Sequence, residues 1–144
     1  MAVHGGGPLR TGQCLCGAVR ITTQGEPIGV RVCWCRVCQY LAAGGATVNA
    51  IFAKADVQVD GALCDYVSIA DSGNVMHRRF CPSCGTPLFS ASEARPDRLI
   101  VRVGAMDNRG DFRPDATIWT KSAPAWACLD ETVPRSPAQP AAIK

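Results

Sequence analysis

Apolar and polar residues alternate with a period of two along most of the chain, in short runs that Gly, Pro, Asp or Asn separate. Such runs are typical of strands with one buried face. They predict strands over residues 18–23, 28–32, 46–52, 57–59, 63–69, 75–80, 87–90, 99–103 and 116–120. Residues 36–43 have the pattern of a short helix. The chain is therefore predicted to be a single, mainly β domain with largely antiparallel strands.

Turn and tail signals mark the limits of these elements. Asp60-Gly61 stands between two predicted strands, and this dipeptide favours a two-residue hairpin turn. Residues 1–10 contain a glycine run, and residues 133–144 contain three prolines. Both segments are predicted to be flexible, with the domain spanning residues 11–132 between them.

Composition favours a reducing compartment. The 144 residues are enough for one core that buries about two-thirds of the unfolded surface, so disulfides are not needed. The nine cysteines are an odd number, and residues 1–11 lack the apolar stretch of a secretion signal. We therefore expect a cytoplasmic protein whose clustered thiols bind metal or take part in chemistry. Charged and polar residues interrupt the most apolar window, 41–59, so no membrane association is expected.

Seven of the nine cysteines fall in three tight groups: Cys14-Leu-Cys16, Cys33-Trp-Cys35-Arg-Val-Cys38 and Cys81-Pro-Ser-Cys84-Gly85. A C-x-x-C turn directs two sulfurs at one metal, and Pro82 and Gly85 suit the backbone of such a turn. Residues two apart in a strand share a face, so Cys14 and Cys16 can also converge. Two converging pairs supply the four ligands of a structural zinc site.

The middle group offers three sulfurs without a partner. Counting ligands then gives a closed site and an open one, and an open zinc site keeps a position for substrate. The closed site would consist of Cys14, Cys16, Cys81 and Cys84, and the open site of Cys33, Cys35 and Cys38.

Three alternatives remain open for these cysteines. Cys35/Cys38 and Cys81/Cys84 could form a zinc ribbon, although the stretch between them is about twice the usual length. Cys35 and Cys38 could be a redox dithiol, or Cys64 or His77 could complete a structural site around the middle group. Cys64 and Cys128 stand alone, and we expect both to pack in the core.

The three cysteine motifs resemble those of the glutathione-dependent formaldehyde-activating enzyme family, which includes the domain of centromere protein V. The resemblance covers roughly residues 11–132 and is carried by residues 12–20, 33–38, 79–85, 103–107 and 123–126. It implies a β-tent of small antiparallel sheets organised around zinc. It also implies two zinc ions per chain, one structural at Cys14, Cys16, Cys81 and Cys84, and one catalytic at Cys33, Cys35 and Cys38.

The activity implied by this resemblance is that of a carbon–sulfur lyase of the S-(hydroxymethyl)glutathione synthase type. Its substrates would be adducts of glutathione or another small thiol with formaldehyde or another small aldehyde. Trp34 stands where family members typically carry His, and it is predicted to wall the site with an apolar face. His77 is a candidate acid or base.

Electrostatics adds a requirement for cations. Three thiolates leave Zn²⁺ with a net charge of −1, and a bound substrate thiolate would bring the centre to −2. Arg36 and Arg79 are the candidates to offset this charge and to contact the substrate. Seven thiolates and two zinc ions would together bring the formal charge of the chain from +3 to zero.

A rival hypothesis is a zinc-stabilised binding module without catalysis. A nucleic-acid version of it would need a basic stripe with interleaved aromatic residues. Arg78-Arg79 is the only adjacent basic pair in the sequence, and acidic residues are interspersed throughout. Nucleic acid is therefore not an expected partner, and the sequence favours the enzyme with small thiol and aldehyde substrates.

Overall fold

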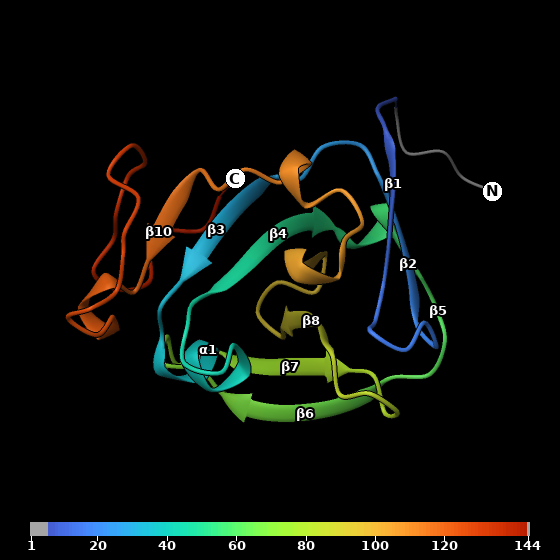
Figure 1. Cartoon of the computed structure of the whole chain (residues 1–144), viewed down its shortest axis with the longest axis horizontal. Coiled ribbons are helices and arrows are strands. Elements are labelled where there is room, and N and C mark those ends of the chain that lie inside the picture. Colours follow the sequence, from blue (N-terminus) through green and yellow to red (C-terminus); the bar gives the residue numbers. More distant parts are fainter. Residues whose placement is uncertain (1–5, 144) are drawn as a thin grey trace.

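The computed structural model describes residues 6–143, which form two β-sheets and, over that range, one α-helix (Figure 1). The three-stranded sheet has the order β1 (Leu9–Gln13), β2 (Arg20–Gln24), β5 (Val57–Asp60). The seven-stranded sheet has the order β10 (Ala116–Ile118), β3 (Gly29–Cys33), β4 (Thr47–Ala53), β9 (Arg98–Arg102), β8 (Pro87–Ser92), β7 (Val75–Phe80), β6 (Cys64–Ile69). The helix α1 (Arg36–Leu41) follows β3.

The prediction of a mainly β single domain is confirmed, with differences of detail. Nine strands lie where the alternation placed them, but β1 was not predicted because its sequence, Leu-Arg-Thr-Gly-Gln, has one apolar side chain. Backbone pairing with β2 holds it instead. The pairing is antiparallel except between β10 and β3. One of the two sheets is also larger than the small sheets that were expected.

The predicted hairpin at Asp60-Gly61 is wrong. β5 pairs with β2 of the three-stranded sheet, whereas β6 pairs with β7 of the seven-stranded sheet, so this dipeptide links two sheets. Gly61 has a φ of +123°, and a Cβ at this position would collide with the carbonyl oxygen of Ala18. The backbone conformation at Gly61 therefore does require glycine, although the residue lies in a tight connection between two sheets and not in a hairpin turn.

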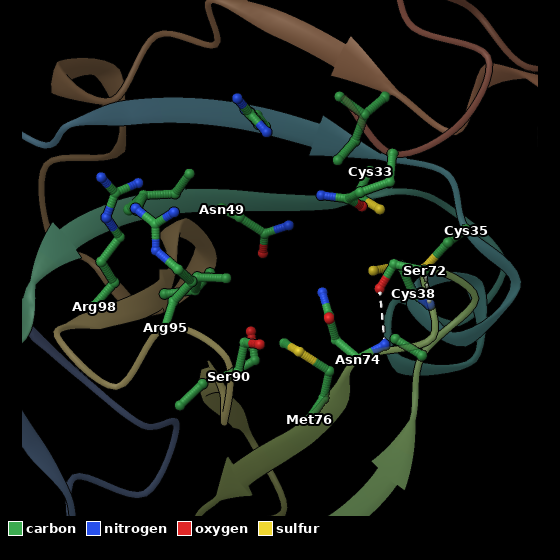
Figure 2. A pocket seen from close by; sticks show the side chains of 18 of the residues that line it. Cys33, Cys35, Cys38, Asn49, Ser72, Asn74, Met76, Ser90, Arg95 and Arg98 are labelled. Atoms are coloured by element: carbon green, nitrogen blue, oxygen red, sulfur yellow. Dashed lines mark hydrogen bonds between the residues drawn. The ribbon is translucent and has the colours of Figure 1, made fainter. Parts of the chain in front are cut away.

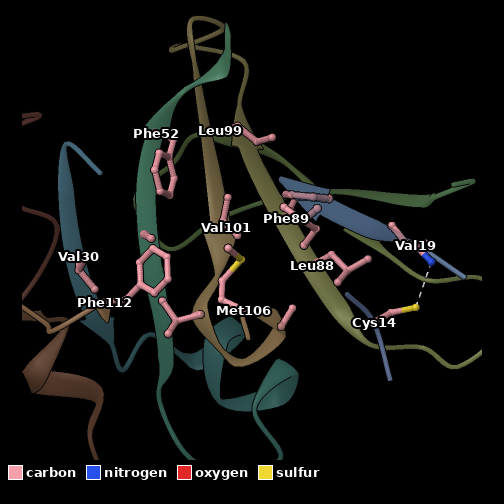
Figure 3. Close-up of a cluster of buried hydrophobic side chains, with 14 of the residues drawn as sticks. Cys14, Val19, Val30, Phe52, Leu88, Phe89, Leu99, Val101, Met106 and Phe112 are labelled. Atoms are coloured by element: carbon pink, nitrogen blue, oxygen red, sulfur yellow. Dashed lines mark hydrogen bonds between the residues drawn. The ribbon is translucent and has the colours of Figure 1, made fainter. Parts of the chain in front are cut away.

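The core lies on one face of the seven-stranded sheet (Figure 3). Val30, Phe52 and Val101 project into it from β3, β4 and β9, and Phe112 packs edge-on against Phe52 with ring centroids 6.3 Å apart. Side chains at alternate positions of the same strands project from the opposite face. That second face is where the cavity described below is found.

The C-terminal segment is not a free tail over the residues that the structure describes. The Thr117 amide donates to the Pro134 carbonyl at 2.9 Å, and the Ser136 amide donates back to the Thr117 carbonyl at 2.9 Å. Trp119 Nε1 donates to Gln139 Oε1 at 3.0 Å. Proline carbonyls still accept hydrogen bonds, and β10 is an edge strand with unpaired backbone groups, so a proline-rich segment can dock there.

At the N-terminus, residues 1–5 lie outside the described range, as does residue 144. Part of the predicted flexible segment has defined partners: Leu9 and Arg10 belong to β1, and the Gly25 amide donates to the Pro8 carbonyl at 2.9 Å. Across residues 6–143, no helix has both the length and the apolar character needed to span a membrane.

His77 connects three neighbouring segments on the face of the seven-stranded sheet that also carries the core. Its Nδ1 lies 2.6 Å from Asp65 Oδ2 on β6, and its Nε2 lies 2.9 Å from Glu93 Oε2, just after β8. Both partners are carboxylates, and only the protonated ring can donate from both nitrogens. The hydrogen bonds with Asp65 and then Glu93 raise the pKa of His77 above its ordinary value of 6.5.

We predict that His77→Gln destabilises the protein mainly at low pH. Because the folded pKa is raised, the contribution of His77 to the free energy of unfolding is complete below the unfolded pKa and is lost as pH rises through the folded pKa. Urea unfolding of wild type and variant should differ at about pH 5.5 and converge toward about pH 9. Arg20→Gln, an exposed change in the other sheet, is the control. A difference for His77→Gln that stays constant or grows with pH would contradict this role.

Candidate functional site

Four cysteines converge where the turns after β1 and β7 meet. The Sγ atoms of Cys14, Cys16, Cys81 and Cys84 all lie within 4.8 Å of one another. Cys16 Sγ lies 3.6 Å from Cys14 Sγ and 3.7 Å from Cys81 Sγ. A tetrahedral zinc ion with four sulfurs at about 2.3 Å separates those sulfurs by about 3.8 Å. The four residues therefore fit a tetrahedral zinc ion.

Backbone amides prepare this cluster for negative charge. The Ser83 amide donates to Cys81 Sγ at 3.3 Å, and the Val19 amide donates to Cys14 Sγ at 3.2 Å (Figure 3). Hydrogen bonds led by the Thr86 hydroxyl lower the pKa of Cys84 to about 5. Gly85 closes the turn with a φ of +77°. The turn after β7 thus favours the thiolate at Cys84 before any metal arrives, whereas the pKa of Cys16 is raised to about 11, mainly by the neighbouring Cys14 thiol.

Three further cysteines form a separate cluster around the start of α1. Cys33 is the last residue of β3, Cys35 caps α1, and Cys38 lies in the first turn of the helix. Their Sγ atoms lie within 4.8 Å of one another, and each residue is only 6% exposed. The Cys38 amide donates to Cys35 Sγ at 3.3 Å. Hydrogen bonds from Cys33 and then Cys35 lower the pKa of the Cys38 thiol.

The structure separates the two cysteine clusters as the ligand count predicted. Among the described residues, neither cluster includes Cys64, His77 or Cys128, and Cys35/Cys38 do not join Cys81/Cys84 as a zinc ribbon would require. Cys64 is half-buried at the start of β6, while Cys128 is exposed, so the expectation of core packing for Cys128 is wrong. Among the described residues, the second cluster thus offers three sulfurs and no fourth ligand from the chain.

A cavity of about 400 Å³ opens beside the three-cysteine cluster, and Cys33, Cys35 and Cys38 line it. Its floor is the face of the seven-stranded sheet opposite the core, from which Asn49, Ser90 and Met76 project (Figure 2). Residues of the C-terminal segment, including Gln139 and Ile143, also line it. The four-cysteine cluster lines neither this cavity nor the smaller one near His77.

The residues predicted to bind substrate do not line this cavity. Trp34 is buried, with its ring edge-on to Trp126 at a centroid distance of 6.4 Å. Arg36 is exposed, with its guanidinium 4.9 Å from the Tyr40 ring centroid. Arg79 points to the other side of β7, where its Nε lies 3.8 Å from Asp65 Oδ2, and His77 is on that side too.

Five other arginines line the cavity: Arg31, Arg78, Arg95, Arg98 and Arg102. Arg102 is buried, and its Nη1 donates to the side-chain oxygen of Asn49. Arg78 is buried as well, and its Nη1 donates to Ser68 Oγ at 2.6 Å. Burial lowers the pKa of Arg102, and the charges of Cys38, Cys33 and Cys35 oppose that effect. The cations that the thiolates require are therefore present, at residues other than those predicted.

A sequence signal for these arginines does exist. Arg31 stands two residues before Cys33, and residues two apart in a strand share a face. Arg98 and Arg102 alternate with Leu99 and Val101, which lie in the core. Sequence reasoning assigns the charged face of such a strand to solvent, because it does not reveal that another segment covers that face.

Comparisons with known proteins agree with this geometry. The family model described as glutathione-dependent formaldehyde-activating enzyme matches residues 9–122. No curated protein matches the chain. The crystal structure of a Rhodobacter sphaeroides protein, a structural genomics target, aligns with a TM-score of 0.56 and 20% sequence identity, over 87% of this chain and 98% of that one. This similarity shows a shared fold. With two cysteine clusters in place and a family match over most of its length, the chain belongs to the glutathione-dependent formaldehyde-activating enzyme family.

Proposed function

We propose that the protein catalyses the reversible addition of a small thiol to formaldehyde or another small aldehyde, a carbon–sulfur lyase reaction. One observation carries the proposal: of the two cysteine clusters, the three-cysteine cluster lines the 400 Å³ cavity. A cluster with a purely structural role has no need of such a cavity. Membership of the family, whose name refers to glutathione and formaldehyde, supports this substrate class.

Two zinc ions per chain are part of this proposal. Cys14, Cys16, Cys81 and Cys84 would hold a structural ion, and Cys33, Cys35 and Cys38 would hold the catalytic one. When bound by three thiolates, zinc supplies the charge that keeps a further sulfur deprotonated at neutral pH. All nine cysteines are free, and both clusters need reduced thiols, so we place the protein in the cytoplasm.

The reaction itself involves no oxidation or reduction. The substrate thiol gives up its proton, and its sulfur attacks the aldehyde carbon. The carbon–sulfur bond forms as the carbonyl π bond breaks, and the oxygen takes up a proton to give the hydroxymethyl thioether. The reverse reaction restores the thiol and the aldehyde. Each step conserves atoms and electrons, so no further co-reactant is required.

The side chains around the cavity fit this chemistry. Arg102 and Arg78 are buried cations that offset the negative charge of a thiolate at the cysteine end. Ile118 and Trp119 pack against the cysteines and keep water from them. Asn49, Asn74 and Ser90 lie between the cysteines and the far wall, where an amide or hydroxyl can donate to the oxygen of the aldehyde (Figure 2). Trp34 has no direct part in this proposal because it lies outside the cavity lining.

We predict that Cys35→Ser abolishes thiol–aldehyde turnover and lowers bound zinc from about two equivalents to about one while the fold persists. The reason is that the variant removes one sulfur ligand from the three-cysteine cluster and leaves the four-cysteine cluster unchanged. Turnover is measured by magnetisation exchange between glutathione and its formaldehyde adduct, above the uncatalysed rate, and zinc by metal analysis.

The matched control is Cys128→Ser, which removes an exposed cysteine that belongs to neither cluster. It should retain both the activity and the metal content. If Cys35→Ser loses both metals and unfolds, the three-cysteine site is structural, and a binding module becomes the better description. Wild-type protein that loads two zinc ions but accelerates no thiol–aldehyde exchange would also overturn the proposed activity.

The four-cysteine cluster gives the opposite prediction. Cys81 is fully buried and its Sγ accepts the Ser83 amide, so Cys81→Ser removes a ligand from the point where the turns after β1 and β7 are held together. Because structural zinc sites contribute folding energy, we expect a fall in thermal midpoint much larger than that for Cys35→Ser. Calorimetric scans of both variants test this. Equal falls for the two variants would contradict the division into a structural and a catalytic site.

A further inference from the structure

The cavity holds guanidinium groups whose hydrogen-bonding capacity is not used. The Nε atoms of Arg31, Arg98 and Arg102 are inaccessible to solvent and have no hydrogen-bond partner among the described residues. A buried donor on a charged group without an acceptor is costly, and more so than a neutral one. Three such guanidinium groups in one cavity lining carry positive charge that no acceptor at these nitrogens offsets among the described residues, which favours an anion in the cavity.

The net charge of the cavity lining also favours an anionic ligand. Five arginines line the cavity, and Asp71 is the only acidic residue in its described lining. Asp71 is engaged elsewhere, since its Oδ2 accepts the Arg36 amide at 3.1 Å. Asp97 lies 3.9 Å from Arg95 Nε and 4.0 Å from Arg98 Nε, too far for hydrogen bonds, and is 71% exposed. Among residues 6–143, carboxylates therefore leave most of this positive charge uncompensated.

The arginines divide between the two ends of the cavity. Arg95 and Arg98 lie at the end opposite Cys33, Cys35 and Cys38 (Figure 2). Burial lowers the pKa of Arg102 and the charges of Cys38, Cys33 and Cys35 oppose that effect, so Arg102 is grouped with the thiolate end of the cavity. A ligand that reaches from one end to the other would thus meet sulfur chemistry at one end and fixed guanidinium groups at the other.

We infer that the substrate enters with a dianionic end group, a phosphate or a close pair of carboxylates, which Arg95 and Arg98 bind. The planar guanidinium fork matches both groups, because a phosphate and a carboxylate each offer two oxygens at the spacing of two parallel N–H groups. An ammonium group at this end would meet cations. The preferred substrate is therefore an acidic thiol whose negative groups lie together, in contrast to a zwitterionic peptide thiol such as glutathione. The inference rests on the proposed function only for the sulfur end.

Sulfur-free probes test the arginine end by itself. Calorimetric titration of the zinc-loaded full chain at low ionic strength compares glycerol phosphate, succinate and the monoanion butyrate. At least one dianion should bind on the order of 10-fold more tightly than butyrate. A stronger response to glycerol phosphate identifies the end group as a phosphate, and a stronger response to succinate identifies it as a dicarboxylate. Equal affinity for all three probes would overturn the inference.

Variants locate the binding site. Arg95→Met changes a side chain that is 41% exposed and is expected to fold, and Arg98→Met changes one that is 15% exposed. Each should weaken dianion binding on the order of 10-fold, since each removes a charge-assisted pair. The control, Arg20→Met, removes an exposed arginine on β2 and should have no effect. Equal losses for Arg95→Met and Arg20→Met would show non-specific attraction and overturn the inference.

Failure of this inference can be told apart from failure of the proposed activity. Thiol–formaldehyde exchange is compared for mercaptosuccinate, glutathione and 2-mercaptoethanol, with wild type and Arg95→Met. The inference predicts that mercaptosuccinate is the best of the three and the one most affected by the variant. Acceleration that is equal for all three thiols and unchanged in Arg95→Met overturns the inference and leaves the activity standing. Specific dianion binding without any acceleration supports the inference and overturns the activity.

Discussion

Adjacent side chains of a strand project to opposite faces of its sheet, and both the hydrophobic core and the cavity of this protein depend on that constraint. On β9, Leu99 and Val101 enter the core while Arg98 and Arg102 line the cavity. The neighbouring strands repeat the division, with Val30 opposite Arg31 on β3 and Ala50 opposite Asn49 on β4. One period-two pattern thus builds a hydrophobic core on one face of the sheet and a polar cavity lining on the other.

The two cysteine clusters present the same ligand chemistry in different settings. Cys14, Cys16, Cys81 and Cys84 supply a full tetrahedral set where two turns meet, away from the cavity. Cys33, Cys35 and Cys38 supply three sulfurs at the cavity wall, because a strand end, a helix cap and the first helical turn fall within six residues. A closed set favours stability, whereas an incomplete set leaves a position for a ligand.

Electrostatics connects the second cluster to the rest of the cavity. A centre with three or four thiolates is negative and buried, so the fold must place cations near it. Arg102 and Arg78 do so from β9 and β7, strands far from the cysteines in the sequence. The C-terminal segment covers the cavity on the side of this cluster. Ala138 packs against the three cysteines, and Gln139 accepts a hydrogen bond from Trp119. The chemistry of the site is therefore assembled from most of the chain.

Much of this could be predicted from the sequence, and the limits have a physical basis. Alternation gave the strands because burying one face of a sheet imposes it, but it missed β1, which backbone pairing holds. Cysteine spacing indicated the two pairs and the group of three because ligands two or three residues apart converge through local geometry, whereas the meeting of Cys14 and Cys16 with Cys81 and Cys84 is a tertiary contact. The need for cations also followed from counting thiolate charges.

Which cations meet that need was decided only by the tertiary structure. Arg36 and Arg79 are close to the cysteines in the sequence, yet Arg36 lies on the exposed side of α1 and Arg79 on the face of β7 that points away from the cavity. Arg31, Arg98 and Arg102 reach the cavity because β3, β4 and β9 are neighbours in one sheet. The sequence by itself determined the local elements and the metal-binding motifs. Strand order and the covering of the second face depend on contacts between distant parts of the chain. Only these contacts place a row of arginines, which the sequence assigns to solvent, in the wall of a cavity.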